Sequence, residues 1–153
     1  MPFPVAPEIP FDDKHTFADY EIRFSEPESP LCVNCRPYGL LHGNLYYLGS
    51  NIREIPIDEK LFANDSHCMV NLRSQTIGIY EKDTGRAVVC DIADFPYTLI
   101  WSKPGQPQFV CIEPWHSLPS AENGSTQWEK KPAAAILAPG EEWSCTLSTD
   151  FVR

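Results

Sequence analysis

The stretch Phe109-Val110-Cys111-Ile112-Glu113-Pro114-Trp115 is the segment from which the fold of this chain can be read. Aromatic and β-branched residues dominate it, which is typical of a β-strand. Side chains of a strand alternate between two faces, so Phe109, Cys111, Glu113 and Trp115 should share one face. A lone carboxylate on an apolar face is costly to bury. Glu113 is therefore either a strand-end residue that reaches water or a general base whose surroundings set its pKa.

Short strand signals recur on both sides of this stretch. Turn residues such as Lys82-Asp83-Thr84-Gly85 and Pro104-Gly105 separate them. The 15 prolines leave little room for long helices. The segments expected as strands are 20–24, 67–72, 76–80, 87–92, 97–101, 109–114 and 143–150. Two further short strands are expected within 40–49, about a Gly-Asn turn. Residues 26–30 should end the first strand. We interpret residues 1–19 as an irregular Pro-rich lead-in, 58–62 as one helical turn and 131–137 as extended. This spacing predicts an all-β chain, a mostly antiparallel sandwich or barrel.

The composition suits one globular domain. A chain of 153 residues with 42% hydrophobic residues can bury a sizeable core. The net charge of -9 and the pI near 4.8 disfavour nucleic acid and anionic membranes as partners. No run is long enough to span a membrane, and Met1-Pro2-Phe3-Pro4 lacks the features of a signal peptide. We therefore expect a cytoplasmic protein.

The six cysteines do not predict a metal site. Cys32 and Cys35 form a CxxC pair, but no second pair follows at zinc-site spacing. The other four lie singly in apolar runs and are expected to be reduced, buried hydrophobes: Cys68, Cys90, Cys111 and Cys145. The sequence also contains no Gly-rich phosphate loop and no Ser-His-Asp order, and we expect no cofactor.

The motifs around Glu113 follow a specific order. Trp101-Ser102-Lys103-Pro104-Gly105 precedes Cys111-Ile112-Glu113-Pro114-Trp115, and Ile55 to Asp65 and Asn71-Leu72 lie upstream. This order resembles the galactose mutarotase (aldose 1-epimerase) superfamily, in particular a bacterial branch of aldose epimerase-like proteins often encoded beside lactose-utilisation genes. The likeness covers nearly the whole chain but only the later part of a family member. It implies one partial domain over residues 1–153, the C-terminal portion of a galactose mutarotase-like β-supersandwich.

The resemblance implies an isomerase that interconverts the α and β anomers of an aldohexose such as galactose or glucose. Ring opening needs a base for the anomeric hydroxyl proton and an acid for the ring oxygen. The resemblance makes Glu113 the base. The resemblance implies that Asp65 binds sugar hydroxyls. Alternatively, Asp65 is a turn residue that caps backbone amides. Trp101 and Trp115 either stack on the sugar or pack in the core, and we interpret His67 and Asn71 as structural.

The acid of the family is not found at its position. Family members carry a histidine in a His-Pro-Ala-Phe motif, where this chain has Pro4 or, after a shift, Glu8. His15 lies outside the motif, and His116 is either a loop residue or a substitute acid. Two functions stay open: an isomerase present here as a fragment or truncated product, and a catalytically silent carbohydrate-binding or remnant β-domain.

Both functions imply an incomplete surface. We expect weak or no catalysis by this chain alone. We also expect exposed sheet edges and an apolar patch, where a missing N-terminal half or another copy of the chain would bind.

Overall fold

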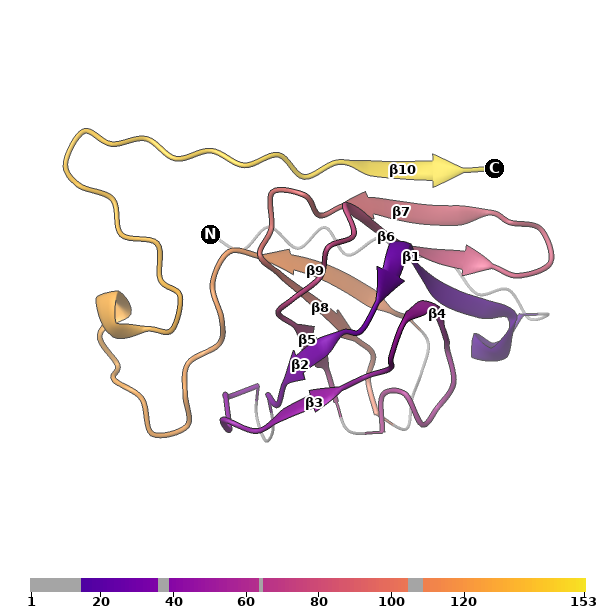
Figure 1. Ribbon diagram of the computed structural model, residues 1–153, viewed down its shortest axis with the longest axis horizontal. Helices are drawn as coiled ribbons and strands as arrows, with labels where there is room; N and C mark the ends of the chain where they lie inside the picture. The colour runs from indigo at the N-terminus through magenta and orange to yellow at the C-terminus, as the bar shows by residue number, and fades with distance from the viewer. Residues whose placement is uncertain (1–14, 36–38, 64, 105–108) are drawn as a thin grey trace.

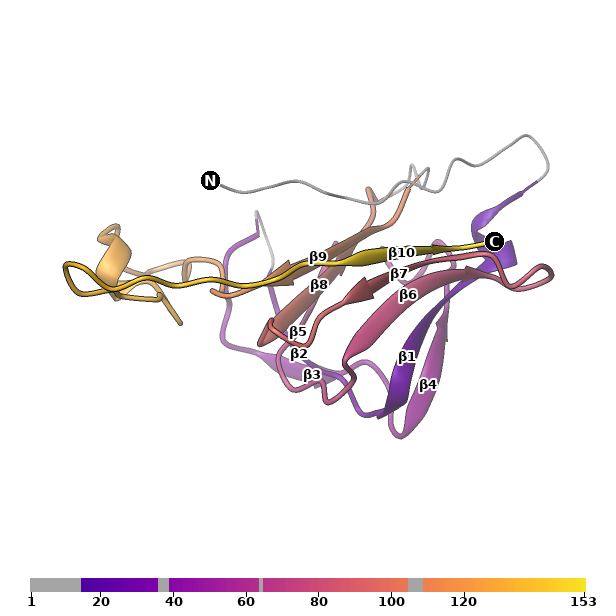
Figure 2. The ribbon, with the colours of Figure 1, turned by 90° about the horizontal axis from the view of Figure 1, so that it is seen from above.

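The computed structural model describes residues 15–35, 39–63, 65–104 and 109–153. In these residues, ten strands form two five-stranded antiparallel sheets that stack face to face (Figures 1 and 2). The helical structure in this part of the chain is two 3-10 turns, η1 (Phe17–Asp19) and η2 (Trp128–Lys130). The predicted all-β, mostly antiparallel sandwich is confirmed. None of the described helices is long and apolar enough to cross a membrane.

Each sheet contains strands from the N-terminal and the C-terminal half of the chain. The first sheet has the order β10-β7-β6-β1-β4, with β1 Tyr20–Glu28, β4 Ile52–Pro56, β6 Thr76–Glu81, β7 Ala87–Asp91 and β10 Thr149–Val152. The second sheet has the order β3-β2-β5-β8-β9, with β2 Leu31–Val33, β3 Leu45–Tyr47, β5 His67–Met69, β8 Tyr97–Trp101 and β9 Cys111–Trp115. Strands β6 to β9 therefore lie within two residues of the segments expected.

The main core lies between the sheets. Alternate residues of the strands point into it, and the most deeply buried are branched or flexible apolar side chains: Ile22, Met69, Ile77, Ile100 and Ile112. Burying each such side chain contributes about 1.5–3 kcal/mol. The opposite face of the second sheet carries a separate, smaller cluster of Cys35, Cys68 and Leu99.

Strand β1 is longer than expected and runs through Pro27 to Glu28. Its register with β4 shifts between Arg23 and Glu28, so the proline sits at an irregularity of the ladder, where its missing N–H is tolerated. The buried Glu28 carboxylate then accepts hydrogen bonds from the backbone of Arg73 and Ser74 and from the Ser74 hydroxyl, at 2.7–2.8 Å. These contacts fix the strand beyond the point where the proline was expected to end it.

The prediction of a two-stranded hairpin within residues 40–49 is wrong. Residues 45–47 form β3, but Leu41 instead makes an isolated parallel bridge to Ala121, far along the chain. The Gly43 backbone has a φ of +74°, which a side chain would disfavour. Strands β2 and β4 were not expected. Strand β2 has three residues, too few to show a period, and in β4 the adjacent charged residues Arg53 and Glu54 interrupt the alternation.

Two further segments differ from the expectation, and a third lies mostly outside the described residues. Strand β5 ends at Met69, because the Asn71 side chain bonds to the backbone of Ser29 and Leu31. This gives Asn71 the structural role expected of it. Residues 59–63 form turns, not a helix, and of the lead-in 1–19 residues 1–14 lie outside the described residues.

The prediction of a strand at residues 143–150 differs most from the structure. Only residues 149–152 pair, as β10 with β7, and the preceding residues run outside the sandwich (Figure 1). Their β-propensity is not realised because no described strand forms a ladder with residues 143–147. The backbone is held instead by single hydrogen bonds, from the Asp91 N–H to the Ser148 carbonyl and from the Thr146 N–H to the Asp94 carboxylate. Cys145 is consequently exposed, contrary to expectation, whereas Cys68, Cys90 and Cys111 are buried.

Candidate functional site

Glu113 lies on the face of the second sheet that points away from the first. Its neighbour Ile112 is buried in the core between the sheets, so Glu113 projects to the opposite side of β9. There it stands opposite Leu99 of β8, a member of the smaller cluster. We call this side, which carries Cys68, Leu99 and Glu113, the outer face of the second sheet.

The two tryptophans flank Glu113 on the outer face. Trp101 pairs with Cys111, and Trp115 pairs with Tyr97, one position to each side of the Leu99–Glu113 pair on this face. Both indoles are half-buried and pack against the smaller cluster. The alternation of the strand thus brings together three of the residues expected to form the site.

The environment of Glu113 favours its neutral form. Burial raises the pKa of this carboxyl, and a hydrogen bond from the Trp115 side chain acts in the opposite direction. A half-buried carboxyl group with a raised pKa and an indole donor is a candidate for proton transfer.

Asp65 lies in the turn segment before β5. Its backbone has a φ of +73°, and its N–H donates to the Phe62 carbonyl at 3.0 Å. A hydrogen bond with Cys68 lowers the pKa of Cys35, while burial and the charge of Asp65 oppose this change. Cys35 belongs to the outer-face cluster, so the charge of Asp65 acts on one member of that cluster.

The CxxC pair does not form a joint site. Cys32 packs in the core between the sheets and Cys35 in the outer-face cluster, on opposite sides of the sheet. Burial raises the pKa of Cys32 to about 12, so its thiol is neutral. All six cysteines are free, and no group of three metal-binding side chains occurs among the described residues.

His67 has the structural role expected of it. Its Nε2 lies 2.5 Å from the Leu61 carbonyl and its Nδ1 lies 2.8 Å from the Tyr46 hydroxyl. Because a carbonyl only accepts, Nε2 carries the proton and Nδ1 accepts from Tyr46. The imidazole therefore holds two segments of the core together.

His15 and His116 are engaged away from the outer-face cluster. The His15 Nε2 atom lies 2.9 Å from the carboxylate of Glu81, on the first sheet. The His116 ring packs against Phe95 and Trp143, with centroids 4.9 and 4.5 Å away. Neither aromatic partner belongs to the cluster beside Glu113.

His42 was not singled out from the sequence. Its Nδ1 lies 3.3 Å from Glu122, and its Nε2 is buried with no hydrogen-bond partner among the described residues. The adjacent Leu41 packs against the outer-face cluster. The backbone bridge that aligns Leu41 with Ala121 is nonlocal, so no local signal in the sequence could have revealed this pair.

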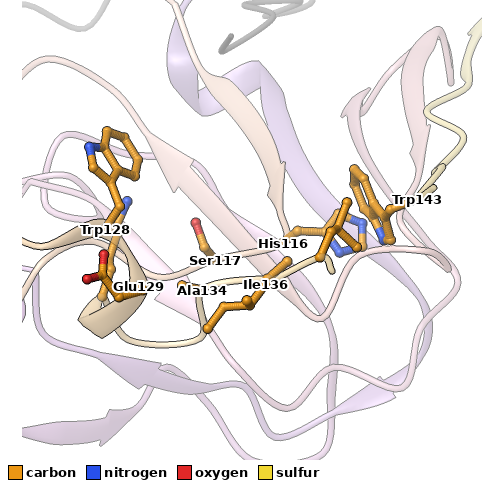
Figure 3. Close-up of a pocket in the computed structure, with 10 residues that line it drawn as sticks. His116, Ser117, Trp128, Glu129, Ala134, Ile136 and Trp143 are labelled. Carbon is orange, nitrogen blue, oxygen red and sulfur yellow. The ribbon is translucent and has the colours of Figure 1, made fainter. Parts of the chain in front are cut away.

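A hollow of about 480 Å³ begins at His116 and Ser117, which follow Trp115 in the chain, and its lining does not include Glu113. It is lined by residues 116–143 of the segment that leaves the sandwich, among them His116, Trp128, Ile136 and Trp143 (Figure 3). Two tryptophans and an isoleucine on one hollow give it an apolar wall.

Known proteins resemble this chain over about half of their length. No protein-family model matches it. The plasmid and chromosomal LacX proteins of Lactococcus lactis subsp. lactis are each 27% identical over 133 residues, which cover 85% of this chain and 44% of LacX.

Two solved structures share the fold. A galactose mutarotase related enzyme from Lactobacillus acidophilus superposes with a TM-score of 0.83 at 21% identity, over 95% of this chain and 49% of the other. A galactose mutarotase-like protein from Lactobacillus casei gives 0.81 at 22% identity, over 94% and 50%. The fold expected from the sequence resemblance is thereby confirmed.

Proposed function

Because the chain has the galactose mutarotase-like fold over about half the length of those proteins, we propose that it supplies the base-bearing half of an aldose 1-epimerase-type site. The substrate class is an aldohexose such as galactose or glucose. The observation that carries the proposal is the position of Glu113, half-buried between Trp101 and Trp115 on one face of a sheet.

The chemistry assigns each residue a role. The Glu113 carboxylate takes the proton of the anomeric hydroxyl, the C1=O bond forms as the C1–O5 bond breaks, and O5 takes a proton from an acid or from water. The ring recloses on the other face after rotation about C1–C2, by the reverse proton transfers. The Trp101 and Trp115 indoles offer flat apolar surfaces for the C–H faces of the sugar. Asp65 accepts hydrogen bonds from sugar hydroxyls.

The ring oxygen needs an acid that this part of the chain does not place beside Glu113. His67 and His15 are engaged as described above. The His116 ring packs against Phe95 and Trp143, and its Nε2 atom has no hydrogen-bond partner among the described residues. His42 is the imidazole with an unbonded nitrogen next to the outer-face cluster. Since a positioned proton-transfer group contributes roughly 100- to 10,000-fold, the chain alone should be a weak catalyst.

This weakness favours a second candidate function, a carbohydrate-binding domain without catalysis. Both candidates use the same outer face, so sugar binding tests what they share. Saturation-transfer NMR with galactose and glucose should show transfer to the sugar protons. The variant Trp115→Ala should lose the signal, and the exposed Tyr47→Ala on β3 should keep it. Binding that survives Trp115→Ala contradicts both candidates.

Polarimetry of freshly dissolved galactose or glucose separates the two. We expect mutarotation by the chain alone to be no faster than in buffer. A large acceleration that His42→Gln abolishes would show that the chain carries its own acid.

A further inference from the structure

Two buried side chains of the outer face have a cover that does not come from the sheet itself. Cys68 and Leu99 are 0% and 5% exposed, although they lie on the face that points away from the first sheet. They stand in one row with Glu113, because Cys68 is opposite Leu99 and Leu99 is opposite Glu113. Most of the half-buried side chains packed against them lie in or next to strands of the same sheet. Among the described residues, the two that come from other segments are Leu41 and Leu118.

These two leucines belong to segments that are hydrogen-bonded to each other. The Leu41 N–H donates to the Ser120 carbonyl at 2.9 Å, and the Leu41 carbonyl accepts from the Glu122 N–H at 3.2 Å. This bridge joins the chain that follows β9 to the loop before β3 (Figure 1). We call residues 117–122 the strap. Its residues are half-buried except Glu122, which is exposed.

An ion pair fastens the end of the strap. The His42 Nδ1 atom lies 3.3 Å from a carboxylate oxygen of Glu122. A carboxylate only accepts hydrogen bonds, so Nδ1 carries the proton. The Nε2 atom of the same ring is buried with no hydrogen-bond partner among the described residues. An unpaired buried nitrogen destabilises the closed arrangement, and separation of His42 from Glu122 would let water hydrate it.

Few contacts hold the strap in place. In the described part of the chain, two backbone hydrogen bonds and one ion pair link it to residues 41 and 42, and Leu118 anchors it on the outer face. A partly exposed ion pair adds little stability. Strands β8 and β9 beneath it are instead paired along their whole length. Segments with few hydrogen bonds open locally at a lower free energy than the core strands.

We propose that residues 117–122 open and close as a strap over the apolar row of Cys68 and Leu99 beside Glu113, with the His42–Glu122 pair as its latch. Opening uncovers the row and widens the outer face next to the carboxylate. The strap therefore controls how much of this face a ligand can contact. The movement is a property of the fold and does not require that Glu113 acts as a base.

The buried cysteines report the opening. Cys35 and Cys68 belong to the outer-face cluster, whereas Cys32 and Cys90 lie in the core between the sheets. Global unfolding exposes all four thiols, but opening of the strap exposes the outer-face pair alone. Initial rates of alkylation by N-ethylmaleimide, resolved by peptide mass spectrometry, give a rate for each thiol. Each thiol is compared with itself between variants, so differences in intrinsic reactivity cancel.

Two variants loosen the strap in different ways. Glu122→Ala removes the ion pair and should raise the alkylation rates of the outer-face pair about 2- to 5-fold. Leu118→Ala removes the apolar anchor and should raise them about 5-fold or more. The rates of the two core thiols should not change. The matched controls Glu142→Ala and Leu45→Ala, at exposed positions away from the strap, should leave all four rates unchanged.

Hydrogen exchange gives an independent measurement. The amide protons of residues 41 and 122 should exchange faster than those of β6 in the wild type, and faster still in Leu118→Ala. Urea denaturation checks that the variants keep their fold and measures their global stability. Rates that rise equally at all four thiols, unchanged rates in Leu118→Ala, or amides 41 and 122 that exchange only with global unfolding overturn the proposal. None of these measurements involves a sugar, so the proposed function stands or falls separately.

Discussion

Leu99 of β8 stands directly opposite Glu113 of β9 and, on its other side, opposite Cys68 of β5. Leu99 and Cys68 are 5% and 0% exposed. The carboxylate is therefore desolvated by an apolar row along one direction. Strand β9 is the edge of the second sheet among the described residues, so no described strand lies on the other side of Glu113. A base needs both properties, because it must hold its proton at a useful pKa and still reach a substrate.

The core between the sheets should dominate stability. Ile100→Ala removes a fully buried side chain and should lower the free energy of unfolding by about 2–5 kcal/mol. Ile136→Ala makes the same chemical change at a site that is 70% exposed, and should cost less than about 0.5 kcal/mol. Urea denaturation of both variants checks this, and equal losses would contradict the assignment of the core.

Glu81 should make the chain sensitive to acid. Hydrogen bonds from Arg86, at 2.7 and 3.1 Å, and from the Thr84 hydroxyl lower the pKa of this carboxyl from 4.5 to about 2. A carboxyl whose pKa is lower in the folded state stabilises the fold above its unfolded pKa. That contribution is lost as the pH falls from about 4.5 to about 2.

The variant Glu81→Gln should therefore be less stable than the wild type at pH 7 and equally stable near pH 2. Thermal unfolding across this range measures the difference. Glu54→Gln, at an exposed position on β4, serves as the control and should follow the wild type. A pH-independent difference for Glu81→Gln would count against the ion-pair account.

One thiol should react far faster than the others. Cys145 is exposed, whereas the remaining five cysteines are buried, and burial raises the pKa of Cys32 to about 12. The thiolate is the reactive form. Titration of the native protein with a disulfide reagent at pH 8 should give one rapid equivalent. Cys145→Ser should abolish it, and two rapid equivalents in the wild type would show that the packing of the cysteines is looser than the structure has it.

The sequence was most informative where strand alternation and neighbouring strands agree. The parity of residues 109–115 correctly separated Ile112 from Glu113 and Trp115, because β9 has a partner along its length. The same propensity failed at residues 143–148, where no described strand pairs with them. Local preference is expressed only when a neighbour receives the backbone hydrogen bonds.

Other features depend on contacts that no local pattern encodes. The Leu41–Ala121 bridge and the ion pair of His42 with Glu122 join segments about eighty residues apart in sequence. Strand β2 has three residues, too few to display an alternation. The resemblance to a family, not periodicity, led to Asp65, whose charge acts on the pKa of Cys35.

The Glu113 carboxylate should lower the stability of the isolated chain at neutral pH. Burial raises the pKa of this carboxyl above 4.5 in the folded state. The fold therefore favours the protonated form: stability is highest below pH 4.5 and declines as the pH rises through the raised pKa. Glu113→Gln stays neutral, so it should exceed the wild type in stability at pH 8 and match it at pH 4. Chemical denaturation at both pH values measures this, and a variant less stable at pH 8 would contradict it.

Glu113→Gln, which should raise stability at pH 8, should lower the rate of catalysis. In a form of the protein that accelerates mutarotation, Glu113→Gln keeps the shape of the side chain and removes its basicity. Turnover should fall by roughly 100- to 10,000-fold, while the sugar dissociation constant changes by no more than a few-fold, because the lost interaction belongs to the transition state. Trp115→Ala should instead weaken sugar affinity, since it removes a stacking surface and leaves the carboxylate. Polarimetry gives the turnover, and titration calorimetry gives the affinity. Turnover within a few-fold of the wild type in Glu113→Gln would refute the role of Glu113 as the base.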